Sequence, residues 1–124
     1  MSGGGRPGVE LRRVYEDIPA GGRSRVLVDR LWPRGIAKAD APFDDWMKEV
    51  APSTELRRWY GHDPAKFEAF ASRYRSELAQ APAAPALARL RALAAQDGVI
   101  LVTATRDVDH SAAEVLLDVL GGPN

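Results

Sequence analysis

The fold is decided by a short run near the carboxyl terminus, Val99-Ile-Leu-Val-Thr103. Five consecutive apolar or β-branched residues are typical of a strand that is buried on both faces, as in a parallel sheet. Asp97-Gly98 turns the chain immediately before this run. Helical patterns precede and follow it in the sequence, and this order predicts an α/β fold.

Two other runs predict strands that share a sheet with Val99–Thr103. Apolar residues alternate with charged ones over residues 9–14, and Arg25-Val-Leu-Val-Asp29 is an apolar run too short for a helix. Residues 16–24, between these runs, hold several turn-forming residues and predict a loop. We expect a roughly three-stranded, mainly parallel sheet covered by helices.

Apolar residues spaced three or four apart predict five helices. Ser53 is a typical N-cap, and Gly61 is a typical helix stop. Asp63-Pro64 combines a cap residue with proline at the first helical position, and Ser111 precedes Glu114 with the spacing of a capping box. The predicted helices cover residues 43–50, 53–61, 64–80, 87–94 and 111–120.

Length and composition indicate one small domain. The chain has 124 residues, of which residues 1–8 are glycine-rich and aperiodic, so we expect a flexible tail there and a single domain over residues 9–121. The 17 basic and 17 acidic side chains cancel, which leaves no overall field to attract nucleic acid or an anionic membrane. The absence of cysteine excludes disulfides, thiolate metal sites and a cysteine nucleophile.

Other functional classes lack their signatures. No apolar run approaches the roughly 20 residues of a membrane span, and the first eight residues have no hydrophobic stretch of the signal-peptide kind, so we expect a cytoplasmic protein without a membrane partner. The sequence contains no phosphate-binding or dinucleotide-binding glycine loop and no serine-hydrolase or zinc-protease motif. Its two histidines have no third ligand cluster beside them, so neither a metal nor a cofactor is expected.

Polar side chains gather directly after two of the predicted strands. Asp29-Arg-Leu-Trp-Pro-Arg-Gly35 follows one of them, and Thr103-Ala-Thr-Arg-Asp-Val-Asp-His110 follows the other. Ligands of open α/β sheets lie outside the carboxyl ends of the strands. If these two strands are parallel neighbours, as a long helical crossover favours, both segments border the same crevice.

Arginine in such a crevice indicates an anionic ligand. Arg30, Arg34 and Arg106 offer forked donors suited to phosphate or carboxylate, and the helix start at Ser111 adds partial positive charge. His110 is a candidate proton donor or acceptor because imidazole titrates near neutrality. Asp29 is a candidate base or orienting group for the guanidiniums.

Each of these residues also has a structural interpretation. Asp29 and Arg30 can pair with each other or with helix caps, and His110 can simply pack in a first helical turn. The tryptophans form an aromatic wall for a ligand in one interpretation and pack in the core in the other. The segment Leu56-Arg-Arg-Trp59 mixes basic and aromatic residues as single-strand nucleic-acid binders do, but it also fits a solvated helix face.

The run Val26-Leu-Val-Asp-Arg-Leu-Trp-Pro-Arg-Gly35, together with Ala51-Pro-Ser-Thr-Glu-Leu-Arg57, resembles the DUF488 family of small bacterial proteins of unknown function, in its YeaO-like branch. The similarity runs from Leu11 to Leu120 and implies a small cytoplasmic α/β protein. Arg106 stands where relatives more often place lysine, which argues against a Schiff base there. The family pattern emphasises Asp29, Arg30, Trp32, Pro33, Arg34, Gly35, Pro52, Ser53, Arg57 and His110.

The leading hypothesis is a crevice for a small anionic metabolite, with turnover left open. His110 and Asp29 are the candidate catalytic residues, His110 for proton transfer and Asp29 for orientation. The candidate ligand-binding residues are Arg30, Trp32, Arg34, Arg57 and Arg106. One alternative is a nucleic-acid-binding or regulatory module that uses Arg57, Arg58 and Trp59, and another is a protein-interaction domain without a ligand.

Overall fold

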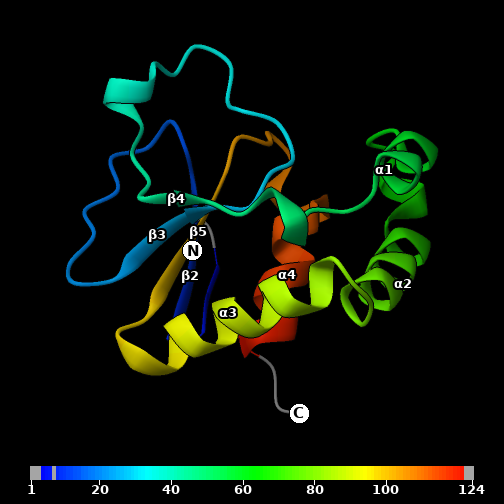
Figure 1. Ribbon diagram of the computed structural model, residues 1–124. Coiled ribbons are helices and arrows are strands. Elements are labelled where there is room, and N and C mark those ends of the chain that lie inside the picture. The colour runs from blue at the N-terminus through cyan, green and yellow to red at the C-terminus, as the bar shows by residue number, and fades with distance from the viewer. Residues whose placement is uncertain (1–3, 7, 122–124) are drawn as a thin grey trace.

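The computed structural model describes residues 4–6 and 8–121 (Figure 1). Its five-stranded sheet has the order β1-β2-β5-β3-β4, in which β1 is antiparallel to β2 and all other neighbours are parallel. The α/β fold with a mainly parallel sheet is therefore confirmed, with five strands where about three were predicted. The elements are β1 (Gly4–Arg6), β2 (Val9–Arg13), β3 (Ser24–Leu27), β4 (Asp45–Trp46), α1 (Thr54–Tyr60), α2 (Phe67–Leu78), α3 (Ala83–Gln96), β5 (Val99–Thr103) and α4 (Ala112–Gly121).

Strand β5 lies between β2 and β3, and all five of its residues are buried. Val99 is opposite Val9 on one side and opposite Ser24 on the other. Because both of its edges are paired and both of its faces are covered, an uninterrupted apolar run suits this position. The strand predicted at residues 99–103 is confirmed, and so is the parallel arrangement of β3 and β5.

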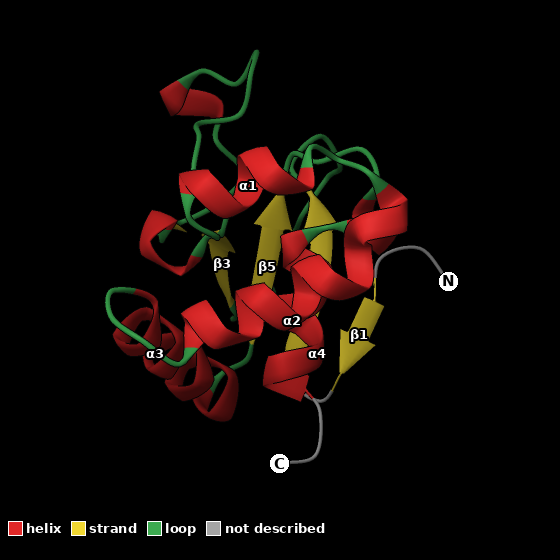
Figure 2. Cartoon of the chain, turned by 90° about the vertical axis from the view of Figure 1, so that its right-hand side faces the viewer, coloured by secondary structure: helices red, strands yellow, loops and turns green. Residues whose placement is uncertain are grey.

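The two faces of the sheet are covered differently. Leu101 packs with the larger apolar cluster, which includes residues of all four α-helices, and Figure 2 shows this helical layer in front of the strands. Ile100 and Val102 point to the opposite face. There they meet residues from the loops after β2 and β3, namely Val14, Ile18, Ile36 and Phe43, together with Leu27 and Trp46 of the strands and Ala104.

The helix predicted over residues 43–50 is wrong. This segment forms the short strand β4 followed by a 3-10 turn at Lys48–Val50. Phe43 and Trp46 pack in the loop-covered cluster, whereas Met47 and Val50 pack in the helix-covered one. Apolar residues that serve both faces of a sheet edge mimic helical spacing, and only the tertiary context separates the two cases.

The amino-terminal segment contains a strand that its composition does not predict. The backbone of Gly4–Arg6 pairs with β2, whereas residues 1–3 and 7 of the expected flexible tail lie outside the described residues. Gly8 follows with φ +81°, and its carbonyl accepts a hydrogen bond from the Val99 N–H at 2.9 Å. A Cβ at Gly8 would lie 2.7 Å from the carbonyl oxygen of Ala94, so only glycine fits this turn.

The local helix signals are confirmed. Ser53 caps α1 by accepting a hydrogen bond from the Leu56 N–H, and Gly61 ends this helix with φ +55°. Ser111 Oγ accepts a hydrogen bond from the Glu114 N–H at the start of α4. The helix predicted over 64–80 consists of a 3-10 turn at Pro64–Lys66 and α2, and α3 is longer than the predicted 87–94.

Candidate functional site

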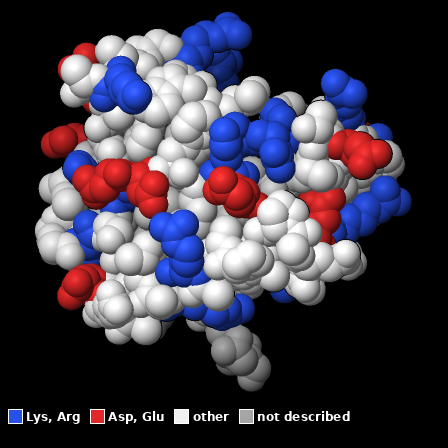
Figure 3. Space-filling model, in the orientation of Figure 1, with Lys and Arg blue, Asp and Glu red and all other residues white. Residues whose placement is uncertain are grey.

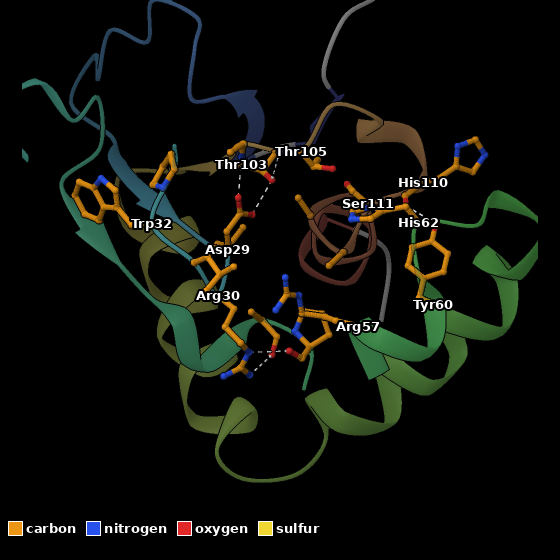
Figure 4. A pocket seen from close by; sticks show the side chains of 18 of the residues that line it. Asp29, Arg30, Trp32, Arg57, Tyr60, His62, Thr103, Thr105, His110 and Ser111 are labelled. Atoms are coloured by element: carbon orange, nitrogen blue, oxygen red, sulfur yellow. Dashed lines mark hydrogen bonds between the residues drawn. The ribbon is translucent and has the colours of Figure 1, made fainter. Parts of the chain in front are cut away.

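A pocket of about 520 Å³ opens at the carboxyl edge of β3 and β5. The segments after these two strands form one part of its wall, and α1 with the start of α4 forms another (Figure 4). Asp29 and Arg34, from the segment after β3, line this pocket together with His110, which lies far from them in the sequence. The shared crevice predicted from the parallel strands is therefore present.

Asp29 joins the ends of β3 and β5. Its Oδ1 accepts a hydrogen bond from Thr103 Oγ1 at 2.7 Å, and its Oδ2 accepts one from the Ala104 N–H at 2.8 Å. Burial raises the pKa of Asp29, and the two hydrogen bonds and the charge of Arg57 offset only part of this rise. Both carboxylate oxygens are thus used within the protein, which is the geometry of a structural latch rather than of a free base.

Arg30 lines the pocket but directs its guanidinium at the backbone. Its Nε donates to the Pro52 carbonyl at 3.0 Å, and its Nη2 donates to the Ala51 carbonyl at 3.3 Å. Figure 4 shows these bonds on the far side of Arg30 from Asp29. Arg30 therefore ties the segment after β3 to the segment before α1, and it does not pair with Asp29.

Arg57 extends from α1 and lies between Arg30 and Tyr60 in the pocket (Figure 4). Within residues 4–6 and 8–121, its guanidinium makes no hydrogen bond or ion pair. The start of α1 is fixed, because Ser53 donates from its N–H and Oγ to the Glu77 carboxylate at 2.8 and 2.6 Å. A rigid helix thus presents an unpaired cation to the pocket.

Arg34 and Trp32 differ in their availability. Arg34 is exposed, and its carbonyl oxygen accepts a hydrogen bond from the Tyr15 hydroxyl at 3.0 Å, which fixes its backbone. Its side chain makes no hydrogen bond or ion pair among the described residues. Trp32 donates from Nε1 to the Ile36 carbonyl at 2.7 Å and meets two other rings edge-on at 5.2 and 5.6 Å. Trp32 therefore packs as the core interpretation predicts while also lining the pocket.

His110 lies at the pocket wall with partners on two sides. Its Nδ1 is 2.9 Å from the Asp107 carboxylate, and its ring meets Phe67 edge-on at 5.4 Å. Its carbonyl oxygen accepts a hydrogen bond from the Tyr60 hydroxyl. Burial raises the pKa of Tyr60, and the charges of Asp107 and Asp63 add to this rise, so the hydroxyl stays a donor that ties α1 to the turn before α4.

The start of α4 also borders the pocket, through Ser111, Ala112 and Ala113. The first N–H groups of a helix have no acceptor within it and carry partial positive charge. Ser111 Oγ accepts a hydrogen bond from the N–H of Glu114. The N–H groups of Ala112 and Ala113 remain beside the pocket without a helical partner.

One predicted residue lies elsewhere, and the structure adds two residues that were not candidates for the site. Arg106 is exposed and does not line the pocket. Arg13 holds the segment before it, donating to the carbonyls of Thr105 at 2.8 Å and Ala104 at 3.4 Å. His62 lines the pocket from a left-handed conformation with φ +57°, which non-glycine residues rarely adopt. Arg13 carries no sequence pattern that would have singled it out, whereas His62 follows the basic and aromatic segment at residues 56–59, whose pattern indicates nucleic-acid binding rather than this pocket.

The Trp59 ring of α1 is contacted by basic side chains from outside this helix. The guanidinium carbon of Arg73 lies 3.9 Å from the centre of the Trp59 ring, and the Lys66 Nζ lies 5.1 Å from it. Figure 3 shows acidic and basic side chains interspersed over one face of the molecule. The part of the chain that the structure describes contains no group of acidic and histidine side chains able to hold a metal ion, and none of its helices is long and apolar enough to cross a membrane.

A family model and individual relatives place the chain in the same protein family. Residues 8–122 match a family model described as the inactive DUF488-N3 subclade. The uncharacterized protein Rv3073c of Mycobacterium tuberculosis is 52% identical over 114 residues, which cover 92% of this chain and 94% of that protein. The uncharacterized protein YeaO of Escherichia coli is 37% identical over 112 residues, or 90% of this chain and 96% of that protein. No solved structure matches the chain. With agreement over nearly its whole length, the chain belongs to the DUF488 family, in its YeaO-like branch.

Proposed function

We propose that the pocket binds a small ligand that carries a phosphate or carboxylate group. The observation that carries this proposal is the unpaired guanidinium of Arg57, which a capped helix presents to the pocket. A charge-assisted hydrogen bond contributes about 1.5–3 kcal/mol, and the planar guanidinium can form two with one oxyanion. An oxyanion is therefore the hydrogen-bonding partner that this side chain lacks.

The charge around Arg57 favours the same kind of ligand. Three arginines and one aspartate line the pocket, and both oxygens of that aspartate, Asp29, already accept hydrogen bonds. The N–H groups at the start of α4 add partial positive charge on another side. A cationic ligand would meet repulsion from several directions.

The proposed role is binding rather than turnover. The subclade that matches the chain is described as inactive. Asp29, the candidate base, is latched between two strands, and the Nδ1 atom of His110 is engaged by Asp107. Asp29 is therefore not free in the way that a general base requires, and both residues have structural partners that account for their positions.

The proposal is tested by titrating inorganic phosphate and acetate into the protein and following its thermal unfolding. A bound anion raises the unfolding temperature in a saturable way. We expect this stabilisation in the wild type and in Arg58→Ala, which removes an exposed arginine of the same helix outside the pocket. Arg57→Ala should abolish it. Equal responses from the two variants, or no response in the wild type, would show that the pocket is not an anion site.

A further inference from the structure

Two large hydrophobic side chains stand out by their exposure. Among the described residues, Tyr15 is 50% exposed and Leu31 is 63% exposed, and these are the exposed large hydrophobics. Both line the pocket that contains Arg57. Exposed apolar surface beside a concave site is a usual property of ligand-binding regions, so the opening combines apolar contact with an unpaired cation.

The Tyr15 ring is held in place before any ligand arrives. Its hydroxyl donates to the Arg34 carbonyl at 3.0 Å, and the guanidinium carbon of Arg13 lies 5.2 Å from the ring centre. Arg13 is itself anchored by the Thr105 and Ala104 carbonyls. The ring therefore has two supports and loses little freedom when another group packs against it.

Hydrogen bonds of its two neighbours hold Leu31 in place as well. Its neighbour Arg30 binds the carbonyls of Ala51 and Pro52, and Trp32 on its other side donates to the Ile36 carbonyl. The Leu31 side chain thus projects from a fixed segment although it is exposed. A leucine that is exposed in this way is suited to cover an apolar group placed at the opening.

The pocket is larger than an anion alone requires. A water molecule occupies about 30 Å³ of liquid, so a phosphate group would fill only a minor part of the 520 Å³. Tyr15 and Leu31 are among the residues that line the same pocket. An aromatic ring suits this wall because it packs against tyrosine in offset or edge-on geometry and against leucine through its face.

We propose that the ligand is an aryl-bearing anion, typified by an aryl phosphate, with its anionic group at Arg57 and its ring against Tyr15 and Leu31. This inference rests on the anion binding proposed above and specifies the uncharged part of the ligand. It assigns the apolar rim formed by Tyr15 and Leu31 to a small molecule rather than to a protein partner.

Calorimetric titration with inorganic phosphate, methyl phosphate and phenyl phosphate tests the inference. Methyl and phenyl phosphate carry the same anionic group, so their affinity ratio isolates the ring. We expect phenyl phosphate to bind the wild type about tenfold tighter than methyl phosphate, since a ring buries more apolar surface than a methyl group. Leu31→Ser should reduce this ratio several-fold. Leu31→Met, which keeps an apolar side chain, should preserve the ratio.

The outcomes separate the two proposals. Equal affinities for methyl and phenyl phosphate in the wild type would overturn the inference about the ring while leaving anion binding intact. A tenfold preference that survives Leu31→Ser and Tyr15→Ser together would remove the assignment to this rim. Absence of binding by all three phosphates would overturn anion binding itself. Sedimentation that reveals dimers in the wild type but not in Leu31→Ser would assign the rim to a contact between copies and would contradict the inference.

Discussion

Replacing Asp29 tests whether its partly buried carboxylate is a structural latch, which joins the ends of β3 and β5. Asp29→Ala removes the acceptor for two donors, the buried Thr103 hydroxyl and the Ala104 N–H. Each buried donor left without a partner costs about 1–3 kcal/mol. Part of this cost is offset, because burial disfavours the ionised carboxylate that the substitution removes. We expect a net loss of about 2 kcal/mol in the free energy of unfolding at neutral pH.

Urea unfolding followed by tryptophan fluorescence measures this loss. With a slope of about 1–3 kcal/mol per molar urea, a loss of about 2 kcal/mol lowers the midpoint by roughly 1 M at unchanged slope. Asp40→Ala, at an exposed position, is the matched control and should change stability by less than about 0.5 kcal/mol. Residues kept for function often limit stability. An unchanged or more stable Asp29→Ala would therefore refute the latch.

The pH dependence of stability tests the role of Asp29 in a second way. Because the folded-state pKa of Asp29 is raised above its usual value of 3.8, the folded protein binds this proton more tightly than the unfolded chain does. Wild-type stability therefore falls, relative to Asp29→Asn, as pH rises from about 3.8 through the folded-state pKa. A wild-type advantage that grows with pH in this window would contradict the burial argument.

Two further predictions concern the scaffold of the site. Asp44→Asn breaks the ion pair between Arg25 and Asp44. In the wild type this pair lowers the pKa of Asp44, so the stability that the pair contributes is present above about pH 3.8 and is lost as pH falls through the folded-state pKa. Because Asp44 is half exposed, urea unfolding at pH 7 should show a loss below about 1 kcal/mol that vanishes in acid, and a loss independent of pH would contradict the pairing. Ser53→Ala removes the α1 cap and the bond to Glu77, so the unfolding free energy should fall by about 1–2 kcal/mol. Ser72→Ala, on the exposed side of α2, is the control, and equal stability of the two variants would show that the cap is unimportant.

Features with local chemical causes could be predicted from the sequence. The strand Val99–Thr103 follows from its apolar run, and the caps at Ser53, Gly61 and Ser111 follow from the conformations that these residue types favour. The shared pocket followed from one further step, the expectation that β3 and β5 are parallel neighbours. These predictions needed only nearby residues and a general rule of topology.

Features that depend on distant partners could not be predicted. Nothing in Gly4–Arg6 or Asp45–Trp46 indicates a strand, because both form by pairing at the edges of an existing sheet. Arg30 and Arg57 look alike as sequence, yet Arg30 is bound by carbonyls about 20 positions away and Arg57 is unpaired. Glu77, which fixes the start of α1, is likewise distant from Ser53 in the chain.

The most direct test of the anion site is a crystal structure of this protein grown in sulfate. Sulfate has the charge and shape of phosphate and can accept from the guanidinium of Arg57 and from the first N–H groups of α4 at 2.7–3.2 Å, the usual hydrogen-bond range. We predict a sulfate ion that bridges these two groups inside the pocket. Sulfate bound only at arginines outside the pocket, such as Arg58 or Arg106, with Arg57 turned away from the pocket, would contradict the account.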